Sequence, residues 1–330
     1  MERPAAFDSK RRDAAPLAPA HGPVVINRTM TRGQWAVLLL LGLIWGGSFL
    51  FIKVGVTHVA PLTFVWLRVA IASLALLLFL RIRGAPQPIG RRTLGPLLVL
   101  ALLNNVTPFL LFAWATTQMA SGLASILNAT TPVWGVLLAH FFTRDEPLSP
   151  ARLGGVLLGF AGVAVMIAPG LTGGRIGLLA QIACLIGAFS YAVAGVYARR
   201  FRGMGIDPVA VTGGQLALSS LVILPFALLI DQPWSRPAPP IEAWTAIVAL
   251  ALICTAFAYV LYFRLIATAG ASNALLVPIL TPPTAILLGG LFLGEALHPL
   301  DFAGLALIAL GLAAIDGRLF SFWRRPRQAA

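Results

Sequence analysis

Apolar residues form long, nearly uninterrupted stretches along this chain, and short polar breaks separate these stretches between residues 34 and 316. Each stretch has roughly 17–25 residues, which is enough for a helix to cross about 30 Å of hydrocarbon. Polar and apolar residues do not alternate as they do in the strands of a membrane β-barrel. The pattern therefore predicts an all-α polytopic membrane protein with ten transmembrane helices, at 34–54, 61–80, 94–115, 119–141, 150–168, 176–198, 208–230, 243–264, 270–292 and 300–316.

The composition of the chain fits a membrane better than water, since 58% of its 330 residues are hydrophobic, 11% are charged and the mean hydropathy is +0.88. A net charge of +13 would point to nucleic acid in a soluble protein, but here the basic residues are sorted by side. If both termini are cytoplasmic, 20 Lys and Arg residues fall inside, Lys53, Arg175 and Arg236 fall outside, and Arg68 lies within the second helix. The positive-inside rule thus predicts cytoplasmic N- and C-termini and no nucleic-acid partner.

The two tails and the cysteines add little chemistry. Residues 1–33 are rich in Pro, Ala and Arg, and they lack the apolar core and cleavage site of a signal peptide, so we expect a disordered cytoplasmic tail. Residues 317–330 are expected to form a basic cytoplasmic tail. Cys184 and Cys254 lie within predicted helices and indicate neither a disulfide framework nor metal-ligand spacing. We expect no cofactor and no metal.

The two halves of the chain resemble each other. The segment LASILNATTPVWGVLLAHFFTRDEPLSPARLGG, from Leu123, is similar to NALLVPILTPPTAILLGGLFLGEALHPLDFAG, from Asn273. The matches are Thr131-Pro132 with Thr281-Pro282, Glu146-x-Leu148-x-Pro150 with Glu295-x-Leu297-x-Pro299, and Gly155 and Gly162 with Gly304 and Gly311. A repeat of five helices crosses the membrane an odd number of times, so the two copies, 34–168 and 176–316, must insert in opposite orientations. Such inverted repeats place a binding site near the membrane midplane, between the copies.

Several motifs resemble those of one transporter family. They are WGGSF in the first helix, NNVTPF and ASGLASILNATTP in the third and fourth, GQLALSS in the seventh, and a TP…GE/DE…P signature in each copy. Together they resemble the EamA-type transporters of the drug/metabolite transporter superfamily, over residues 35–316. The resemblance implies a ten-helix inner-membrane carrier of small metabolites, often an exporter. It leaves the cargo undefined because members differ widely in what they carry.

Polar and aromatic residues inside the first two helices allow both structural and functional interpretations. Gly42 and Gly46 have the four-residue spacing of a close helix contact. Trp45 is either a packing aromatic or a cavity wall, and Lys53 is best explained by extension of its side chain to the outer surface. Arg68 lies about two turns into its helix, where an unpaired guanidinium is costly. It has either a structural or gating role or a role in substrate attraction.

The third and fourth helices are the richest in hydrogen-bonding groups. Small and polar residues recur every three or four positions along the fourth helix, and they must face other helices because amides and hydroxyls need partners in lipid. Ser121 and Ser125 suit interhelical hydrogen bonds, whereas Asn128 is the better cavity candidate. Pro108, Pro132 and Pro282 interrupt the backbone ladder at depth, which suits either binding or hinging. We group these prolines with Arg68 as gating or structural residues.

Some kinds of chemistry are missing from the sequence. No predicted helix interior contains Asp or Glu, so a proton-coupled carrier of lipophilic cations has no obvious embedded carboxylate to use. No P-loop, no H-E-x-x-H and no cluster of His, Cys and carboxylates is present, which argues against an enzyme and against ATP-driven transport by this chain alone. We favour neutral, zwitterionic or weakly anionic cargo.

These observations predict a secondary transporter in the cytoplasmic (inner) membrane that moves a small metabolite, such as an amino acid, by alternating access. Export is favoured on resemblance alone. The expected partners are a small-molecule substrate and membrane lipid, and a homodimer is compatible with the sequence. The alternatives are a proton-coupled drug efflux carrier and a non-transporting membrane scaffold. The residues predicted to line the substrate cavity are Trp45, Asn105, Asn128, Trp134, Gln181 and Gln215.

Overall fold

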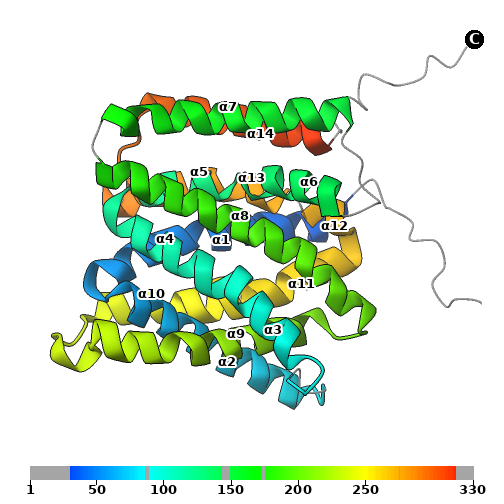
Figure 1. The fold of residues 1–330 in the computed structure, drawn as a ribbon, viewed down its shortest axis with the longest axis vertical. Coiled ribbons are helices and arrows are strands. Elements are labelled where there is room, and N and C mark those ends of the chain that lie inside the picture. Colours follow the sequence, from blue (N-terminus) through cyan, green and yellow to red (C-terminus); the bar gives the residue numbers. More distant parts are fainter. Residues whose placement is uncertain (1–29, 86–88, 143–148, 173–174, 275, 317–330) are drawn as a thin grey trace, which may run out of the picture.

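The structure, a computed structural model, describes residues 30–85, 89–142, 149–172, 175–274 and 276–316. Within these ranges the chain forms ten helical spans, eight of them long and apolar enough to cross a membrane and two of them shorter (Figure 1). The first five spans are α1 (Arg32–His58), α2 (Pro61–Ile82), α3 (Leu94–Ala101) continued by η1 (Leu102–Val106) and α4 (Thr107–Gln118), α5 (Ser121–Asn128) with α6 (Thr131–Phe142), and α7 (Pro150–Thr172). The second five are α8 (Arg175–Gly203), α9 (Pro208–Phe226) with η2 (Ala227–Asp231), α10 (Ile241–Ala251) with η4 (Leu252–Phe257) and α11 (Ala258–Ala269), α12 (Ala271–Ala274) with α13 (Val277–Leu293), and α14 (Pro299–Asp316), while a short turn, η3 (Pro233–Ser235), follows η2. The predicted all-α membrane fold with ten helices is confirmed.

The predicted helices agree with the structure except in the fourth and ninth spans. The sequence predicts one helix over 119–141, whereas the structure has α5 and α6 with a break at Ala129 and Thr130. In the ninth span the sequence predicts one helix over 270–292, whereas the structure has a short α12 followed by α13. Gly270 ends α11 with φ 87°, a conformation that favours glycine, and Pro278 near the start of α13 has no N–H for a continuous helix. The predicted tails, 1–33 and 317–330, lie outside the described residues apart from the start of α1 and the few residues before it, and so does the loop that holds Glu146.

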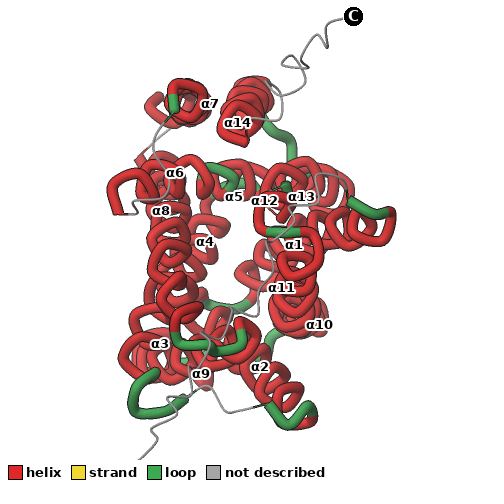
Figure 2. The backbone as a smooth tube through the Cα atoms, turned by 90° about the vertical axis from the view of Figure 1, so that its right-hand side faces the viewer, coloured by secondary structure: helices red, strands yellow, loops and turns green. Residues whose placement is uncertain are grey.

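Hydrogen bonds between spans hold together the end of the bundle at which α1 terminates. Lys53 near the end of α1 donates to the carbonyls of Thr116 and Met119 at the end of α4. Asp231 at the end of η2 accepts from the N–H of Thr63 at the start of α2. We call this the His58 end, and the opposite end, where α1 begins, the Arg32 end. The helices run between these ends across Figure 1 and toward the viewer in Figure 2.

The two copies are inverted relative to each other, as the packing of α7 against α14 demonstrates. A Cβ added to Gly155 would lie 2.5 Å from the carbonyl oxygen of Gly311, and one added to Gly162 would lie 2.7 Å from that of Gly304. In the repeat, Gly155 aligns with Gly304 and Gly162 aligns with Gly311. Gly155 therefore lies against the counterpart of Gly162, and Gly162 lies against the counterpart of Gly155. Cross-pairing of this kind is what a two-fold axis between antiparallel helices produces. The predicted inverted repeats are therefore confirmed.

Other helix pairs are related by the same two-fold axis between the copies. Helix α2 packs against its counterpart α9, while α1 packs on α13 in the same way that α8 packs on α6. The crossing of α1 and α13 is close, because a Cβ on Gly46 would lie 2.5 Å from the Cβ of Thr284. The pair α7 and α14 lies along one side of the bundle (Figure 2). The remaining spans surround the centre, where the two copies meet.

The third and eighth spans are both interrupted at mid-length by a π-turn, at Leu102–Val106 and Leu252–Phe257. In the third span Pro108 has no N–H to donate to the carbonyl four residues earlier, so the regular ladder cannot continue through this point. In the eighth span the hydroxyl of Thr255 bonds the carbonyl of Leu250, five residues earlier, at 2.8 Å. Such π-turns widen the helix and turn neighbouring side chains to new directions. They position the polar side chains described next.

Candidate functional site: a central cavity between the copies

A cavity of about 630 Å³ lies between the two copies. Its lining reaches the Arg32 end, where it includes the exposed Arg199 and Arg202 at the end of α8 and Pro208 at the start of α9. Toward the His58 end the lining stops at buried side chains, among them Phe49, Ile52 and Phe112. The cavity therefore communicates with solvent at the Arg32 end and is closed at the other.

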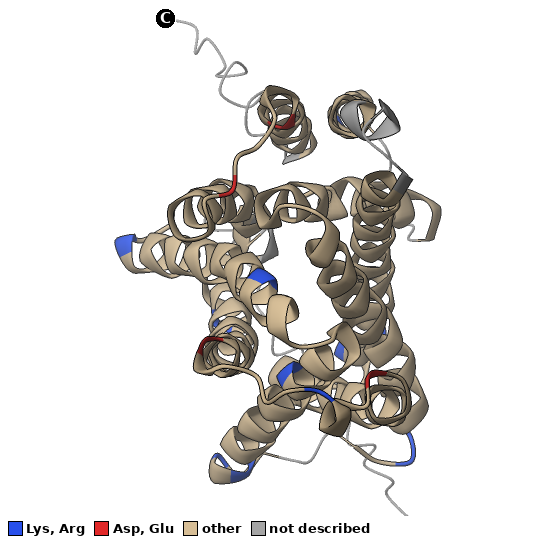
Figure 3. Cartoon of the chain, turned by 90° about the vertical axis from the view of Figure 1, so that its left-hand side faces the viewer, with Lys and Arg blue, Asp and Glu red and all other residues tan. Residues whose placement is uncertain are grey.

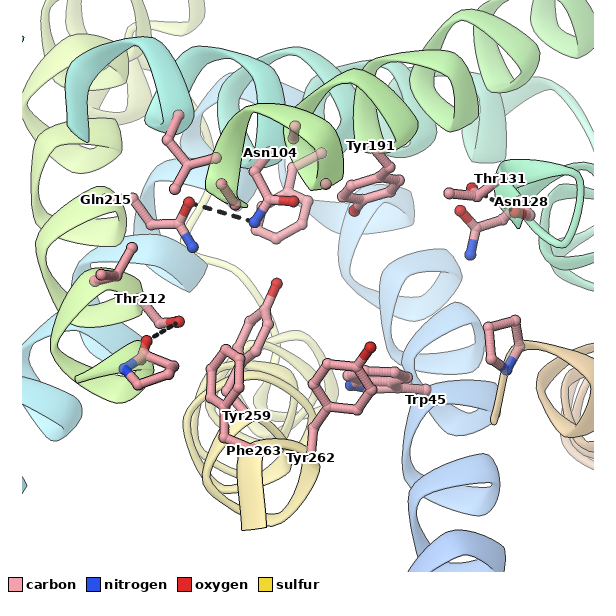
Figure 4. Close-up of a pocket in the computed structure, with 18 of the residues that line it drawn as sticks. Trp45, Asn104, Asn128, Thr131, Tyr191, Thr212, Gln215, Tyr259, Tyr262 and Phe263 are labelled. Carbon is pink, nitrogen blue, oxygen red and sulfur yellow. Dashed lines mark hydrogen bonds between the residues drawn. The ribbon is translucent and has the colours of Figure 1, made fainter. Parts of the chain in front are cut away.

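Three of the six predicted cavity residues line this space. Trp45 contributes from α1, Asn128 from the last position of α5, and Gln215 from α9 (Figure 4). Arg68 of α2, which the sequence assigns to a gating or structural group, also lines it. These residues come from helices of both copies, as a site between inverted repeats requires.

The other three predicted cavity residues lie elsewhere, which corrects the sequence-based assignment of their place. Asn105 is fully buried and donates to Ser219 of α9 at 3.1 Å, so it joins two helices. Trp134 packs edge-on against Phe160 and Phe189, between α6, α7 and α8. Gln181 is buried on α8 and is absent from the lining. Asn105 and Trp134 thus face neighbouring helices instead of the cavity, and Gln181 is buried away from it.

The prolines predicted to gate or shape the path lie at helix irregularities. Pro132 is the second residue of α6, directly after the break that ends α5 at Asn128. Pro108 is the second residue of α4, after the first π-turn, and Pro282 lies inside α13. Pro132 and Pro282 each follow a threonine that lines the cavity, Thr131 and Thr281. These prolines therefore shape the backbone next to the site, while their roles in gating remain predictions.

The guanidinium of Arg68 lies at the closed side of the cavity. The residue is 9% exposed, its Nε donates to the hydroxyl of Thr255 at 3.1 Å, and its Cζ lies 3.7 Å from the centre of the Phe109 ring. A cation over an aromatic face is attracted by the ring quadrupole, which offsets part of the cost of burial. The π-turn of the eighth span presents Thr255 to this arginine.

Gln215 occupies the equivalent position in the second copy. It lies seven residues after Pro208 at the start of α9, and Arg68 lies seven residues after Pro61 at the start of α2. The Oε1 of Gln215 accepts from the Nδ2 of Asn104, in the other π-turn, at 3.3 Å (Figure 4). The cavity thus contains two polar positions related by the inverted repeat, and one is cationic while the other is neutral.

Aromatic rings form much of the remaining wall. Trp45 lies 5.1 Å from Tyr262 and 6.3 Å from Tyr259 between ring centroids, and Phe112 stacks on Tyr191 at 6.1 Å. The rings of Tyr259 and Tyr262 lie across the space from Asn104 and Asn128 in Figure 4. An apolar surface with a few convergent polar groups is typical of a small-molecule site.

The His58 end is closed by charged side chains that bind helix termini. The carboxylate of Glu295 accepts from the N–H of Ser121 at 2.9 Å and from its hydroxyl at 2.7 Å, at the start of α5. Lys53 lies 2.8 Å from the carbonyl of Thr116. The anion and the cation each face the helix terminus of opposite partial charge. Charged residues are otherwise sparse along the bundle (Figure 3).

Sequence reasoning missed part of the lining. Asn104 and Asn105 are adjacent in the NNVTPF motif, and nothing in the sequence decides which of the two amides faces the cavity. Phe109 and Phe112 gave no signal, because an aromatic in an apolar span is expected anywhere. Within the described residues, no group of three His, Cys, Asp or Glu side chains could hold a metal ion. The arrangement can bind and release a small molecule, and the described lining offers no nucleophile paired with a base.

Comparison with known proteins agrees with this architecture. The model of the EamA-like transporter family matches residues 34–168 and 178–315. An uncharacterized inner membrane transporter of Escherichia coli, YedA, is 27% identical over 88% of this chain and 93% of its own length. A probable amino-acid metabolite efflux pump of the same organism is 26% identical, over 86% of this chain and 94% of its own. A probable terminal-alkyne amino-acid exporter of Streptantibioticus cattleyicolor is 26% identical, over 91% and 98%.

A solved crystal structure shares the fold at a TM-score of 0.64 and 19% identity, covering 91% of this chain and 100% of the solved one. At this identity the likeness concerns the fold alone.

Proposed function

Because this chain belongs to the EamA-like transporter family, we propose that it is a secondary transporter that exports a small metabolite across the cytoplasmic membrane. The family consists of transporters rather than enzymes. Two relatives at 26% identity are described as handling amino acids or their metabolites, one as an efflux pump and one as an exporter. We therefore propose an amino acid or a related compound as the cargo.

The observation that carries this proposal is the cavity between the inverted copies, which reaches solvent at the Arg32 end while Glu295 and Lys53 close the His58 end. In alternating access, rocking of one bundle against the other exposes one midplane site to each side in turn. On this proposal, equivalent helices of the two copies alternately open and close the two ends of the bundle. We propose that the described state is one of the two required.

We further propose that the Arg32 end faces the cytoplasm, so that both termini are cytoplasmic and the cavity loads cargo from inside. The sorting of the basic residues along the chain supports this orientation. An epitope tag at either terminus should then become accessible to antibody only after the cells are permeabilised. A homodimer also remains a proposal, and native mass spectrometry of the detergent-solubilised protein would test it.

Asn128 gives the most direct test of the site. It lines the cavity, and its buried Oδ1 has no hydrogen-bond partner in the described chain, so this side-chain oxygen does not join two helices. Asn128→Ala should lower metabolite efflux from vesicles about fivefold, the loss of roughly one hydrogen bond, without lowering membrane abundance. Asn105→Ala is the matched control, because that amide joins α9 and should affect stability more than efflux. Unchanged efflux by Asn128→Ala would remove that residue from the site.

Two other functions make different predictions. A proton-coupled drug efflux carrier would expel a cationic dye only with a proton gradient imposed. A membrane scaffold would release nothing from vesicles loaded with a mixed metabolite pool. Among the described spans no acidic residue lines the cavity, which favours the metabolite carrier over a carrier of cations.

A further inference from the structure

Arg68 has charge and hydrogen-bonding capacity that the protein leaves unused. A guanidinium offers five N–H donors, and within the described chain Arg68 uses only Nε, toward Thr255. The remaining donors belong to the terminal nitrogens of a side chain that lines the cavity. The residue is 9% exposed, and a buried charge without a charged partner is costly. A ligand that supplies the missing anion would remove much of that cost.

The described carboxylates are engaged elsewhere. Asp231 bonds the N–H of Thr63 at the start of α2, Glu295 bonds Ser121 at the start of α5, and Asp207 caps the start of α9. Asp301 bonds the N–H of His298, and Glu242 lies at the exposed start of α10. The protein thus supplies no carboxylate to Arg68 from its described part.

The rest of the lining also suits an anion. It includes Arg199 and Arg202 at the Arg32 end, and no Asp or Glu of the described chain. In a cavity walled by aromatic rings, low polarity strengthens the attraction between Arg68 and an anion. Planar guanidinium groups bind carboxylates through two parallel N–H···O bonds, which fixes the orientation of the ligand.

We propose that Arg68 is the residue that binds the carboxylate of the cargo. The cargo class is therefore small carboxylates, including amino acids, and it excludes amines and carboxamides that lack a carboxylate. The inference rests on the proposed transport function and assigns its specificity to one side chain. Thr255 and Phe109 hold the guanidinium in place. The apolar part of the cargo then lies toward Trp45, Tyr259 and Tyr262.

The experiment uses proteoliposomes of the purified full chain, loaded with a defined equimolar pool of amino acids, simple organic acids and the matching carboxamides and amines. The efflux of each compound is measured by mass spectrometry. In the wild-type protein, carboxylates should leave at least tenfold faster than their own carboxamides. Arg68→Gln should reduce this ratio roughly 10- to 100-fold, as expected for the loss of a charge-assisted pair. Arg68→Lys keeps the charge and should retain most of the preference.

A second variant distinguishes a purely structural role of Arg68 from the proposed binding of the cargo carboxylate. Thr255→Val removes the bond to Nε but keeps the charge, so it should lower thermal stability and reduce the carboxylate preference less than Arg68→Gln does. If Arg68→Gln slows all compounds equally, or if carboxamides leave as fast as carboxylates in the wild type, the inference is wrong and the transport function stands. If no compound leaves wild-type vesicles, the transport function itself fails, and the inference fails with it.

Discussion

The two ends of the bundle are held together by different kinds of contact. At the His58 end, Glu295, Lys53 and Asp231 each bind backbone groups at a helix terminus of another span. At the Arg32 end, a neutral bond joins the Gln34 side chain of α1 to the carbonyl of Thr268 in α11, and it is exposed. The closed end thus depends on charge at helix termini, where water can replace each partner when the end opens.

The same asymmetry extends into the cavity. Arg68 lies on α2, which begins at the His58 end, and Gln215 lies at the equivalent position of α9, which begins at the Arg32 end. The inverted fold provides both positions, but only one carries a charge. Symmetry of the backbone thus explains where polar groups meet the cavity, and the individual residues decide what each end binds and how firmly it closes.

Removing the carboxylate of Glu295 should produce the largest change. Glu295→Ala leaves the Ser121 N–H and hydroxyl without their partner and costs the closed end about 2 kcal/mol, so the equilibrium should shift roughly 30-fold toward opening at the His58 end. We expect a cysteine placed at Ile52, in a variant lacking Cys184 and Cys254, to react correspondingly faster with a thiol reagent added from that side. Ile52 lines the cavity at its closed side and is buried in the described state.

The matched variant for this experiment is Glu295→Gln, which keeps the shape and one acceptor oxygen but loses the charge. It should give an intermediate rate. A rate at Ile52→Cys that is identical with and without Glu295→Ala would show that the carboxylate does not hold this end closed.

Lys53 should have a smaller effect. The sequence favours extension of this lysine to the membrane surface, whereas the structure places its Nζ 2.8 Å and 3.1 Å from two carbonyls at the end of α4. Lys53→Met removes a cation from a helix C-terminus at a cost of about 1 kcal/mol, which corresponds to roughly fivefold faster labelling of the same cysteine. Lys53→Arg keeps the charge and should remain near the wild-type rate. Faster labelling of this cysteine in the Lys53→Arg variant than in the Lys53→Met variant would contradict a charge-based contact.

The fold could be predicted from the sequence because it depends on features spread over the whole chain. The ten apolar stretches and the aligned glycines of α7 and α14 are patterns that involve many residues. An error of a few positions in a predicted helix bound therefore leaves the predicted fold unchanged. The fourth and ninth spans are the exceptions, because the breaks after Asn128 and at Gly270 are local backbone features.

The site was less predictable because single side-chain directions decide it. Asn104 and Asn105 are adjacent, and successive residues of a helix point about 100° apart, so one faces the cavity and the other bonds Ser219. The π-turn that contains both residues sets these directions, and although Pro108 indicates an irregular helix here, it does not indicate which way each amide points. Glu295 is recognisable as a residue at a helix end, but its partner Ser121 is 174 positions away in the chain.

Gln215 should give the smallest effect, since its bond to Asn104 is neutral and 3.3 Å long. Gln215→Ala should weaken cargo binding about two- to fivefold, corresponding to roughly 0.5–1 kcal/mol for one ordinary hydrogen bond. The measurement is the concentration dependence of efflux for Gln215→Ala, Asn104→Ala and the double variant, since a double-mutant cycle isolates the pair. If the two residues act together, the double variant should lose little more than either single one. A loss from Gln215→Ala as large as that from Arg68→Gln would show that the neutral position binds cargo as strongly as the charged one, and the proposed asymmetry of the cavity would be wrong.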